Sequence, residues 1–389
     1  MKPIHIKPLI RLNVFYHSVG GKMEVYIRNY LLLEKYLKLS KETKNMILSH
    51  FESYQYIKWS YISDHRAYFK IEASVLLPDT VEGSMIMRAC HDELLRMQRS
   101  NIDYITPLSK YYPEILYHYK PYVNIMFTKG NKELLGDARR VAIVGSRKPT
   151  SYGRKVAFDL GKYLAKLGVI IVSGMALGVD AQAHRGALDV NGKTIAVLAS
   201  GVNQVYPPTN EPIYNAILNQ EGLILSEQFI DDMALKHHFP LRNRIISAIS
   251  DVVVIIEAGE KSGSLITATH AIEQGKTVFA LPGNINSPQS IGCNQLIYEG
   301  AIPLISFAHI AEHLGLSNNL QNERDYINVS HLSDLSQRIY EFLKFKKTLS
   351  IEEIKAAMNC EYSEIYAAVS ELILDDLCEY SSLTDIILV

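Results

Sequence analysis

The chain has 389 residues, of which 48% are hydrophobic and 21% charged, and its formal net charge is -1. This length exceeds a single ordinary core and predicts two or three domains of a soluble globular protein. Because the chain is not a polycation, nucleic acid would have to be held by a local basic patch rather than by bulk charge.

Two further classes are disfavoured by what the sequence lacks. The four cysteines are scattered without a C-x-x-C pair or a His/Cys cluster, which predicts reduced thiols in a cytoplasmic protein and no metal site. No run of 18 or more apolar residues occurs, and residues 1–18 lack the apolar core of a signal peptide. We therefore expect neither a membrane partner nor a membrane span.

Residues 1–100 are rich in Lys, Tyr and Leu. The stretches LLLEKYLKL and SKETKNMILSHFESY have helical spacing, and Ser40 with Thr43 offers a helix start signal. The pattern predicts a mainly helical N-terminal domain over residues 1–100, with irregular or β elements near YFKIEASVLL.

Residues 101–312 carry the strongest pattern. Residues 101–140 repeat Tyr and Pro around one strand-like run, VNIMFTKG, and are expected to pack on the sheet that residues 141–310 predict. In those later residues, helical patterns such as KVAFDLGKYLAKLG alternate with continuously apolar runs, namely VAIVGS, VIIVSG, TIAVLAS, LILSE, DVVVIIEAG and TVFALPG. Runs of this kind are typical of strands buried on both faces, and the alternation predicts parallel strands joined by right-handed crossovers. The predicted fold class is α/β, a doubly wound Rossmann-like parallel sheet.

Residues 313–330 are polar and aperiodic, which predicts a linker. In residues 331–389, three helical segments and a possible hairpin predict a C-terminal winged-helix-like domain. The third segment, SEIYAAVSELILDD, contains Glu364, Glu371, Asp375 and Asp376 but no Lys or Arg. Because such a surface repels phosphate, we predict that this helix contacts protein and does not read DNA.

Small residues, hydroxyls and cations follow the predicted strands, at the edge where open α/β sheets bind ligands. These residues include Gly145-Ser146-Arg147, Gly174 and Gly178, Ser200-Gly201, Ser226-Glu227, the segment from Glu257 to Ser264, and Pro282-Gly283-Asn284. Any one such turn needs Gly and Ser for tight geometry alone. Six turns on one edge, together with three arginines, favour an anionic ligand, and Arg suits phosphate. The absence of G-x-G-x-x-G and of a Walker A motif argues against a dehydrogenase or a P-loop enzyme.

The stretch HHFPLRNRIIS, residues 237–247, places two arginines before an apolar run. Arg242 and Arg244 are two apart, so they point to different sides. We expect Arg242, nearer the helix N-terminus, to contact the anionic ligand, and Arg244 to pair with Glu227 or Glu257.

Other residues near this stretch have two interpretations. His237 and His238 are expected in a loop that Pro240 fixes before the helix, and Phe239 either stacks a base or packs in the interior. Asp180 and His184, at i and i+4, are predicted to be a helix-surface pair rather than a catalytic dyad.

The ordered string from VAIVGSRKPTSYG through SGMALGVDAQAHRGAL, HFPLRNRIISAIS and VVVIIEAGEKSGSLITATHAIEQG to GCNQLIYEGA resembles the DNA-processing protein A (DprA/Smf) family, over roughly residues 101–306. The resemblance implies a bacterial cytoplasmic protein of natural transformation that binds and protects incoming single-stranded DNA and loads the RecA recombinase on it. It also implies a non-enzymatic protein without a nucleotide cofactor, and a homodimer formed through the Rossmann-like core.

The resemblance also implies a set of DNA-contacting residues. By position these are Gly145, Ser146, Arg147, Phe239, Arg242, Asn243, Arg244, Ser262, Gly263, Ser264, Thr267 and Asn294. The strand-end glycines Gly174 and Gly178 complete the predicted site, which has no catalytic residue. Many members carry a DNA-contacting lysine after a Tyr-Pro pair, where this chain has Pro208, so that contact is missing or supplied by Lys236 or Lys148.

Two alternatives remain open. The first is a nucleotide-processing enzyme of the phosphoribohydrolase (lysine decarboxylase-like) group, whose motif is P-G-G-x-G-T-x-x-E. The corresponding stretch is EAGEKSGSLITATHAIE, where Thr267 lacks the expected spacing to a catalytic Glu, and Glu257 and Glu273 are the acids to test. The second is a pure protein scaffold, against which the strand-end arginines and glycines argue.

Overall fold

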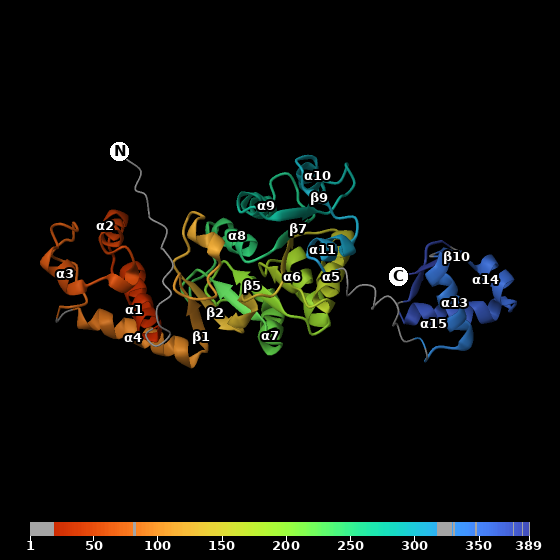
Figure 1. Ribbon diagram of the computed structural model, residues 1–389, viewed down its shortest axis with the longest axis horizontal. Coiled ribbons are helices and arrows are strands. Elements are labelled where there is room, and N and C mark those ends of the chain that lie inside the picture. Colours follow the sequence, from red (N-terminus) through yellow and green to blue (C-terminus); the bar gives the residue numbers. More distant parts are fainter. Residues whose placement is uncertain are drawn as a thin grey trace. The chain divides into compact units, whose positions relative to one another are not determined.

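The computed structural model describes residues 19–80, 83–316, 329, 331–346, 348–375, 377–382 and 384–388. The chain divides between Gly315 and Leu316 into two units, each with its own internal contacts. Figure 1 shows both units, coloured along the sequence.

A nine-stranded sheet forms the centre of the first unit, in the order β1-β2-β6-β5-β4-β3-β7-β8-β9. All six apolar runs are strands, as predicted: β3 (Arg140–Gly145), β4 (Ile170–Ser173), β5 (Thr194–Leu198), β6 (Leu223–Ser226), β7 (Val252–Ile256) and β8 (Thr277–Ala280). The short β9 (Ile302–Pro303) extends this parallel part. The fold is therefore the predicted α/β, Rossmann-like one.

The sheet is not parallel throughout, however. The predicted strand in VNIMFTKG is β2 (Met126–Gly130), which pairs antiparallel with β6. A strand that the sequence did not predict, β1 (Ile102–Ile105), pairs antiparallel with β2 at the sheet edge. Residues 101–140 thus extend the sheet itself, where the sequence predicted only packing on it.

The order of the strands places a crevice at the middle of the sheet. From β3 the chain builds outward through β4 and β5 to β6, and then returns to place β7 on the other side of β3. Loops that leave β3 and β7 go to opposite faces at such a point, so a ligand crevice opens beyond the carboxyl ends of these two strands.

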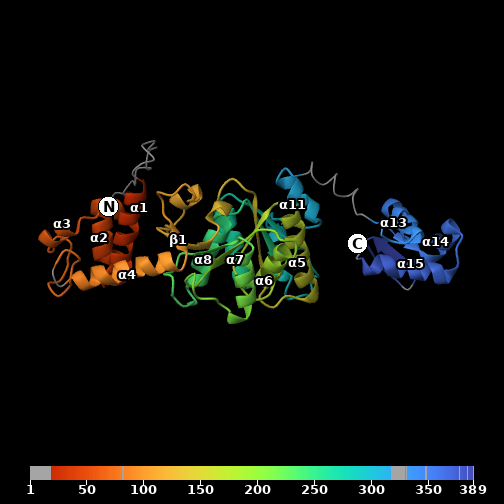
Figure 2. The same cartoon turned by 90° about the horizontal axis from the view of Figure 1, so that it is seen from below.

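Helices cover both faces of the sheet, which explains why its strands are continuously apolar. One apolar cluster joins β2, β5 and β6 to α6 (Val179–Asp189) and α7 (Glu211–Asn219). Another joins the opposite face to α8 (His238–Ala248), α9 (Gly263–Glu273) and α10 (Ile291–Tyr298). Figure 2 shows α5 (Ser151–Lys166), α6 and α7 side by side, and α11 (Phe307–His313) follows β9 in the chain.

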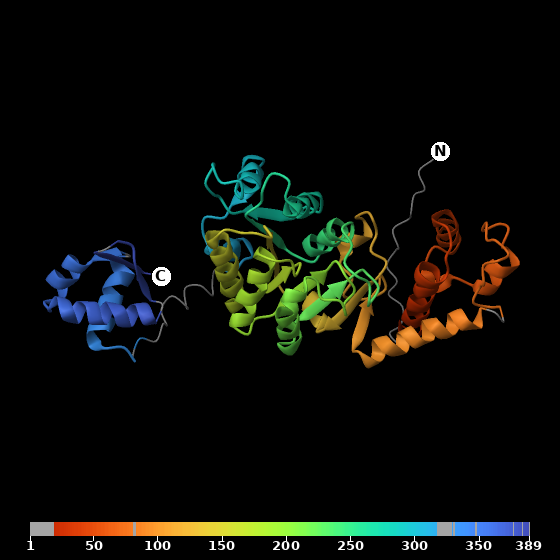
Figure 3. The ribbon, with the colours of Figure 1, turned by 180° about the vertical axis from the view of Figure 1, so that it is seen from behind.

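The region before β1 is mainly helical, as predicted. It contains α1 (Val19–Leu31), a π-helix (Leu32–Tyr36), α2 (Lys41–Phe51), α3 (Trp59–Asp64) and α4 (Ser84–Arg99), with α4 leading into β1 (Figure 3). The Ser40 hydroxyl accepts a hydrogen bond from the Thr43 backbone N–H at 3.1 Å, which confirms the predicted helix start. Of the irregular or β elements expected near YFKIEASVLL, the irregular ones are confirmed, because residues 68–77 contain turns and no strand.

The N-terminal helices share an apolar cluster with the sheet. Leu31 and Ile62 belong to the same cluster as Phe127 and Ile224, and the rings of Tyr30 and Phe229 lie 5.9 Å apart. The domain boundary at residue 100 stays a prediction, because these contacts join both sides of it in one unit.

The second unit contains the three predicted helices, α13 (Asp334–Lys346), α14 (Ile351–Met358) and α15 (Tyr362–Leu374). The predicted hairpin consists of β11 (Cys378–Tyr380) and β12 (Asp385–Leu388), and a further strand, β10 (Thr348–Ser350), pairs with β12. The winged-helix assignment stays a prediction. Most of the predicted linker lies outside the described residues.

Among the described residues, no helix combines the length and apolarity that a membrane crossing requires. The same residues contain no group of three or more His, Cys, Asp or Glu side chains arranged to hold a metal ion. The four cysteines carry no disulfide, in line with the prediction of free thiols.

Close packing of α5 on α6 generates a test of the fold. A Cβ at Gly186 would lie 2.0 Å from the Phe158 carbonyl oxygen, so Gly186→Ala must push the two helices apart. We expect the free energy of unfolding to fall by about 1–3 kcal/mol, measured by urea unfolding. The matched control is Gly21→Ala on α1, where no atom lies within 4 Å of the new Cβ, and stability should rise slightly. Equal unfolding midpoints for the wild-type protein and Gly186→Ala would contradict this packing.

Candidate functional site

A cavity of about 540 Å³ lies beyond the carboxyl ends of β3 and β7, and we call it the switch-point pocket. Ten of the fourteen predicted site residues line it: Gly145, Ser146, Arg147, Phe239, Arg242, Asn243, Ser262, Gly263, Ser264 and Thr267. They come from the turn after β3, the first half of α8 and the turn that begins α9. The tertiary structure therefore brings together three segments that are far apart in the sequence.

The turn after β3 presents a cation over an aromatic ring. The Ser146 backbone N–H donates to the Glu257 carbonyl at 2.7 Å, and the Lys148 N–H donates to the Ser146 hydroxyl at 3.1 Å, which fixes the turn. Arg147 is exposed, and its guanidinium carbon lies 4.8 Å from the centre of the Phe239 ring. The Tyr206 ring, 47% exposed, meets Phe239 edge to face at 5.8 Å. Phe239 is thus a partly covered ring beneath a cation at the rim of the pocket.

Glu257 is buried beside this turn, and its partner differs from the predicted one. Its carboxylate accepts hydrogen bonds from the backbone N–H of Thr150, at 2.7 Å, and from the Thr150 hydroxyl. Thr150 in turn caps α5 by accepting from the Gly153 N–H at 3.1 Å. The expectation that Glu257 holds an arginine is wrong, because the free donors of a helix N-terminus attract this carboxylate.

The HHFPLRNR stretch is helical from His238 onward. The predicted pre-helix loop is therefore confirmed for His237, which lies in the turn before α8, and wrong for His238. Pro240 occupies the first turn of α8, where a proline costs no hydrogen bond because the N–H there has no helical partner. As predicted, the two arginines diverge: Arg242 lines the switch-point pocket, whereas Arg244 lines a different cavity.

Arg242 is 6% exposed and is tied to the ends of two strands. Its Nη1 donates to the carbonyl oxygens of Gly174, at 2.5 Å, and Val197, and its Nε donates to Asn243 Oδ1 at 3.0 Å. Burial lowers the pKa of this guanidinium to about 10, so it stays charged at neutral pH. Among the described residues Nη2 has no hydrogen-bond partner, which leaves one donor for a ligand. That Arg242 contacts DNA stays a prediction.

Arg244 pairs with Glu227, one of the two predicted partners. Its Nη2 donates to both carboxylate oxygens, at 2.8 and 2.6 Å, and the arginine is only 2% exposed. Burial raises the pKa of Glu227, and the charge of Arg244 opposes that rise. Arg244 does not line the switch-point pocket, and its contact with DNA stays a prediction.

The remaining three predicted residues, Gly174, Gly178 and Asn294, do not line the switch-point pocket but support residues or turns close to it. A Cβ at Gly174 would lie 2.5 Å from Arg242 Nη1, so only glycine lets the guanidinium approach. Gly178 has φ of 81°, and its Cβ would meet the Ser146 carbonyl oxygen at 2.4 Å. Asn294 bonds both backbone groups of Gly283, at 3.2 and 3.0 Å, and so fixes the turn after β8.

Asp180 and His184 were predicted to lie on a helix surface, and this is wrong. Asp180 lines the switch-point pocket, where its Oδ2 accepts from the N–H groups of Gly174 and Ala176, at 3.1 and 3.3 Å. His184 is fully buried, with Nδ1 2.7 Å from the Thr194 hydroxyl. Because that hydroxyl donates to the Ile171 carbonyl at 2.7 Å, the proton between the two groups belongs to His184 Nδ1.

Sequence reasoning also missed Gln289, which lies after β8 and accepts a hydrogen bond from the Ser146 hydroxyl at 3.3 Å. No motif marks this residue. Lys148 lines the pocket as well, and the sequence had indicated it only as a possible substitute for the missing lysine. Lys261 also lines the pocket, and it stood in a strand-end turn without being assigned to the site.

A model of the DNA recombination-mediator protein A family matches residues 103–315. The DNA processing protein DprA of Bacillus subtilis (strain 168) is 39% identical over 221 residues, which cover 57% of this chain and 74% of that protein. Protein Smf of Escherichia coli (strain K12) is 39% identical over 227 residues, which cover 58% of this chain and 60% of that protein. The alignment with the second relative thus spans less than two thirds of its length.

Two solved structures are similar to this chain. The structure of DNA processing protein A from Streptococcus pneumoniae has a TM-score of 0.57 at 31% identity and covers 73% of this chain and 97% of its own. The structure of DNA processing protein A from Helicobacter pylori, which concerns that protein's single-stranded DNA binding mode, has a TM-score of 0.50 at 36% identity. It covers 55% of this chain and 97% of its own.

The buried His184 generates a prediction on pH. Burial lowers its folded-state pKa to about 3 from an ordinary value of 6.5, so the folded protein resists protonation that the unfolded chain accepts. The contribution of His184 to the free energy of unfolding is fully present above the pKa that His184 has in the unfolded chain. It is lost as the pH falls toward the pKa that His184 has in the folded protein. Between pH 7.5 and 5.0 this group should cost about 2 kcal/mol of unfolding free energy. His184→Gln should lose that part of the pH dependence of the unfolding free energy, which urea unfolding across this pH range measures. The control variant His50→Gln, which changes an exposed histidine, should keep it. The same pH dependence in wild-type protein and His184→Gln would refute the assignment.

Proposed function

Because the chain belongs to the DNA recombination-mediator protein A family, we propose that it binds single-stranded DNA in the switch-point pocket. In this proposal the protein protects incoming DNA during natural transformation and loads a RecA-type recombinase on it. It acts in the cytoplasm, as a homodimer formed through the Rossmann-like core, without catalysis and without a cofactor.

The observation that carries the proposal is the charge of the pocket. Its lining residues include four cationic side chains, Arg147, Lys148, Arg242 and Lys261, and one carboxylate, that of Asp180, which already accepts two backbone hydrogen bonds. A positive groove beside a partly exposed aromatic ring suits a strand whose phosphates need cations and whose bases stack without strict sequence readout. Phe239 beneath Arg147 is that ring.

The start of α9 supports a phosphate contact. The Ser262 hydroxyl accepts from the Ser264 N–H at 3.4 Å and caps the helix, and Ser262, Gly263 and Ser264 all line the pocket. Helix N-termini favour anions because their first N–H groups lack helical partners and the helix dipole is positive there. Gly263 carries no side chain to hinder the approach of a phosphate.

Lys148 is our candidate for the contact that the family's lysine makes at the position of Pro208. Lys148 lines the pocket directly after Arg147, whereas Lys236 does not line it. The acidic α15 is proposed to contact protein. One of its acids, Glu371, is already hydrogen-bonded to the Ser333 and Ser336 hydroxyls.

The phosphoribohydrolase alternative requires a carboxylate that is free to do chemistry. Glu257 does not line the pocket, and both of its oxygens accept from Thr150. Glu273, at the last residue of α9, accepts from the Tyr119 hydroxyl. Release of free base from a nucleoside monophosphate, if it were abolished by Glu257→Gln or Glu273→Gln, would establish the alternative instead.

The sharpest test of DNA binding is Arg147→Ala, because Arg147 is exposed and its removal should leave stability unchanged. We expect the affinity for a single-stranded oligonucleotide to fall about tenfold, and the slope of log affinity against log salt to shrink by about 0.7 for the lost phosphate contact. Fluorescence anisotropy between 50 and 200 mM salt, roughly the range where such contacts dominate, measures both.

The matched control is Arg185→Ala, which removes an exposed arginine of α6 outside the pocket. If both variants bound like the wild-type protein, the site would be wrong. Stimulation of recombinase filament formation on the same oligonucleotide tests the loading step separately.

The homodimer is supported by exposed apolar side chains near the edge strand β9. Tyr298, which ends α10 before β9, is 87% exposed, and Ile305, which follows β9, is 70% exposed. Exposed apolar groups beside a strand edge mark contact surfaces. We expect the wild-type protein to sediment as a dimer and the double variant Tyr298→Asp, Ile305→Asp as a monomer. Leu374→Asp, which changes a side chain 84% exposed on α15, should sediment as the wild type does. A monomeric wild-type protein at micromolar concentration would contradict this interface.

A further inference from the structure

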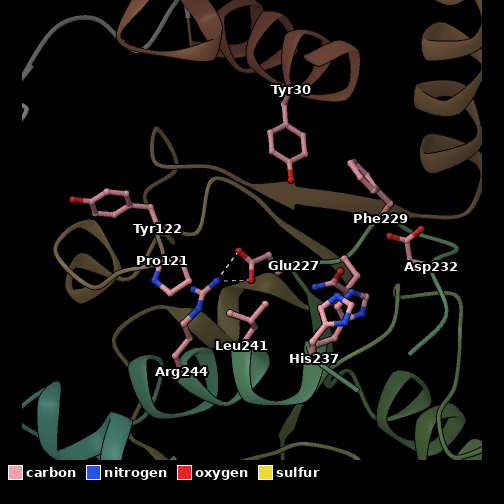
Figure 4. Close-up of a pocket in the computed structure, with 11 residues that line it drawn as sticks. Tyr30, Pro121, Tyr122, Glu227, Phe229, Asp232, His237, Leu241 and Arg244 are labelled. Carbon is pink, nitrogen blue, oxygen red and sulfur yellow. Dashed lines mark hydrogen bonds and ion pairs between the residues drawn. The ribbon is translucent and has the colours of Figure 1, made fainter. Parts of the chain in front are cut away.

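A second cavity, of about 310 Å³, lies on the other side of α8, and the proposed function makes no use of it. We call it the Arg244 pocket. Its polar walls include Tyr30, Glu227, Asp232, His237 and Arg244 (Figure 4). Tyr30 comes from α1, whereas Arg244 comes from α8, so the N-terminal helices and the sheet unit build this pocket together.

The guanidinium of Arg244 lacks two hydrogen-bond partners. Its Nη2 holds both oxygens of Glu227, but Nε and Nη1 are buried and have no acceptor among the described residues. Buried donors of this kind are nearly always satisfied in a folded protein. The pocket is therefore incomplete by at least one acceptor.

The Tyr30 hydroxyl has no hydrogen-bond partner among the described residues either. Figure 4 shows it pointing from the opposite wall toward the Arg244–Glu227 pair. Tyr30 is 9% exposed, and burial raises the pKa of this phenol, so the hydroxyl stays protonated and available as a donor. The cavity thus has a buried guanidinium in one wall and a hydroxyl donor in the opposite wall.

The charges in the pocket disfavour an ion as the ligand. Glu227 lies 2.6 Å from Arg244 and neutralises it, and Asp232 adds a further carboxylate, so a free anion is repelled. Burial lowers the pKa of His238, which keeps that imidazole neutral at pH 7. A cation would be repelled by the positive guanidinium of Arg244. The walls therefore suit an uncharged group that carries both acceptors and donors.

The walls also suit a flat group. Rings from Tyr30, Tyr122, Phe229, His237 and Pro121 line the cavity. Its volume is about ten times the share of one water molecule in the liquid, and it stands at the lower end of the range for small-ligand pockets. That space accommodates one heterocycle with its sugar.

We infer that the Arg244 pocket binds a nucleobase. Base carbonyl oxygens accept from Arg244 and Tyr30, amino groups donate to Glu227 or Asp232, and the aromatic walls stack on the ring faces. Enzymes that take a base out of a strand read it in the same way, by hydrogen bonds to its edge and by stacking. The base belongs either to a free nucleoside or to the bound strand. If the base belongs to the bound strand, the inference rests on the proposed function; if it belongs to a free nucleoside, it does not.

The first experiment is isothermal titration of the full chain with each of the four deoxynucleosides, and with deoxyribose 5-phosphate as the probe without a base. We expect at least one nucleoside to bind the protein saturably and the sugar phosphate not to bind. Tyr30→Phe removes one hydroxyl and keeps the ring, so it should weaken that nucleoside about 3- to 10-fold. Tyr122→Ala changes a side chain that is 39% exposed, and it tests the stacking wall without opening the core.

Two controls make the result specific. Tyr56→Phe removes a hydroxyl from a tyrosine that is 51% exposed and lies outside the pocket, and it should bind nucleosides as the wild type does. Arg147→Ala should also leave nucleoside binding unchanged while it weakens oligonucleotides. Failure of the proposed function therefore appears in the oligonucleotide titration, and failure of this inference in the nucleoside titration.

A second arm identifies the source of the base. If Tyr30→Phe weakens a normal oligonucleotide but not one made of abasic sites, the pocket takes a base of the bound strand. If it weakens only the free nucleoside, the ligand is a nucleoside. The inference is overturned if no nucleoside saturates on the folded wild-type protein, or if Tyr30→Phe and Tyr122→Ala both bind nucleosides as tightly as the wild type.

Discussion

The buried guanidinium of Arg242 holds the two candidate sites in place. It binds the carbonyl oxygens of Gly174, directly after β4, and of Val197, the last residue but one of β5, and so fixes α8 against the carboxyl edge of the sheet. A buried cation is tolerated only when its donors are satisfied, and here backbone carbonyls supply most of the acceptors. Gly174 permits the contact because any side chain there would occupy the space of the guanidinium.

Helix α8 separates two cavities of different character. Phe239 and Arg242 face the cationic switch-point pocket, whereas His237 and Arg244 face the balanced pocket that α1 closes. The alternation follows from helical geometry, because side chains two positions apart point in nearly opposite directions. One short segment therefore contributes a cationic wall to the first pocket and a wall with neutral hydrogen-bonding character to the second, and the N-terminal helices complete only the second.

Most carboxylates near the sites hold the structure rather than perform chemistry. Glu257 binds the start of α5, Asp180 binds the turn after β4, and Glu227 neutralises Arg244. Glu257 and Asp180 are buried and Glu227 is partly buried, and each compensates the loss of water by accepting hydrogen bonds from protein donors. Asp180 is the one carboxylate that lines the switch-point pocket among the described residues, against four cationic side chains, so the pocket keeps an excess of positive charge, which holding phosphates requires.

The sequence by itself determined the strands, because a segment buried on both faces must be continuously apolar. It also determined that Arg242 and Arg244 diverge, because the spacing of side chains on a helix is a local property. It also indicated the cationic and glycine-rich turns. Only the tertiary structure decided that the turns after β3, β4 and β7 share one pocket while Glu227 after β6 faces another, since strand order depends on long-range pairing. It likewise decided that Asp180 and His184 are buried and that Glu257 binds Thr150. Local spacing carries no information on which helix face another element covers.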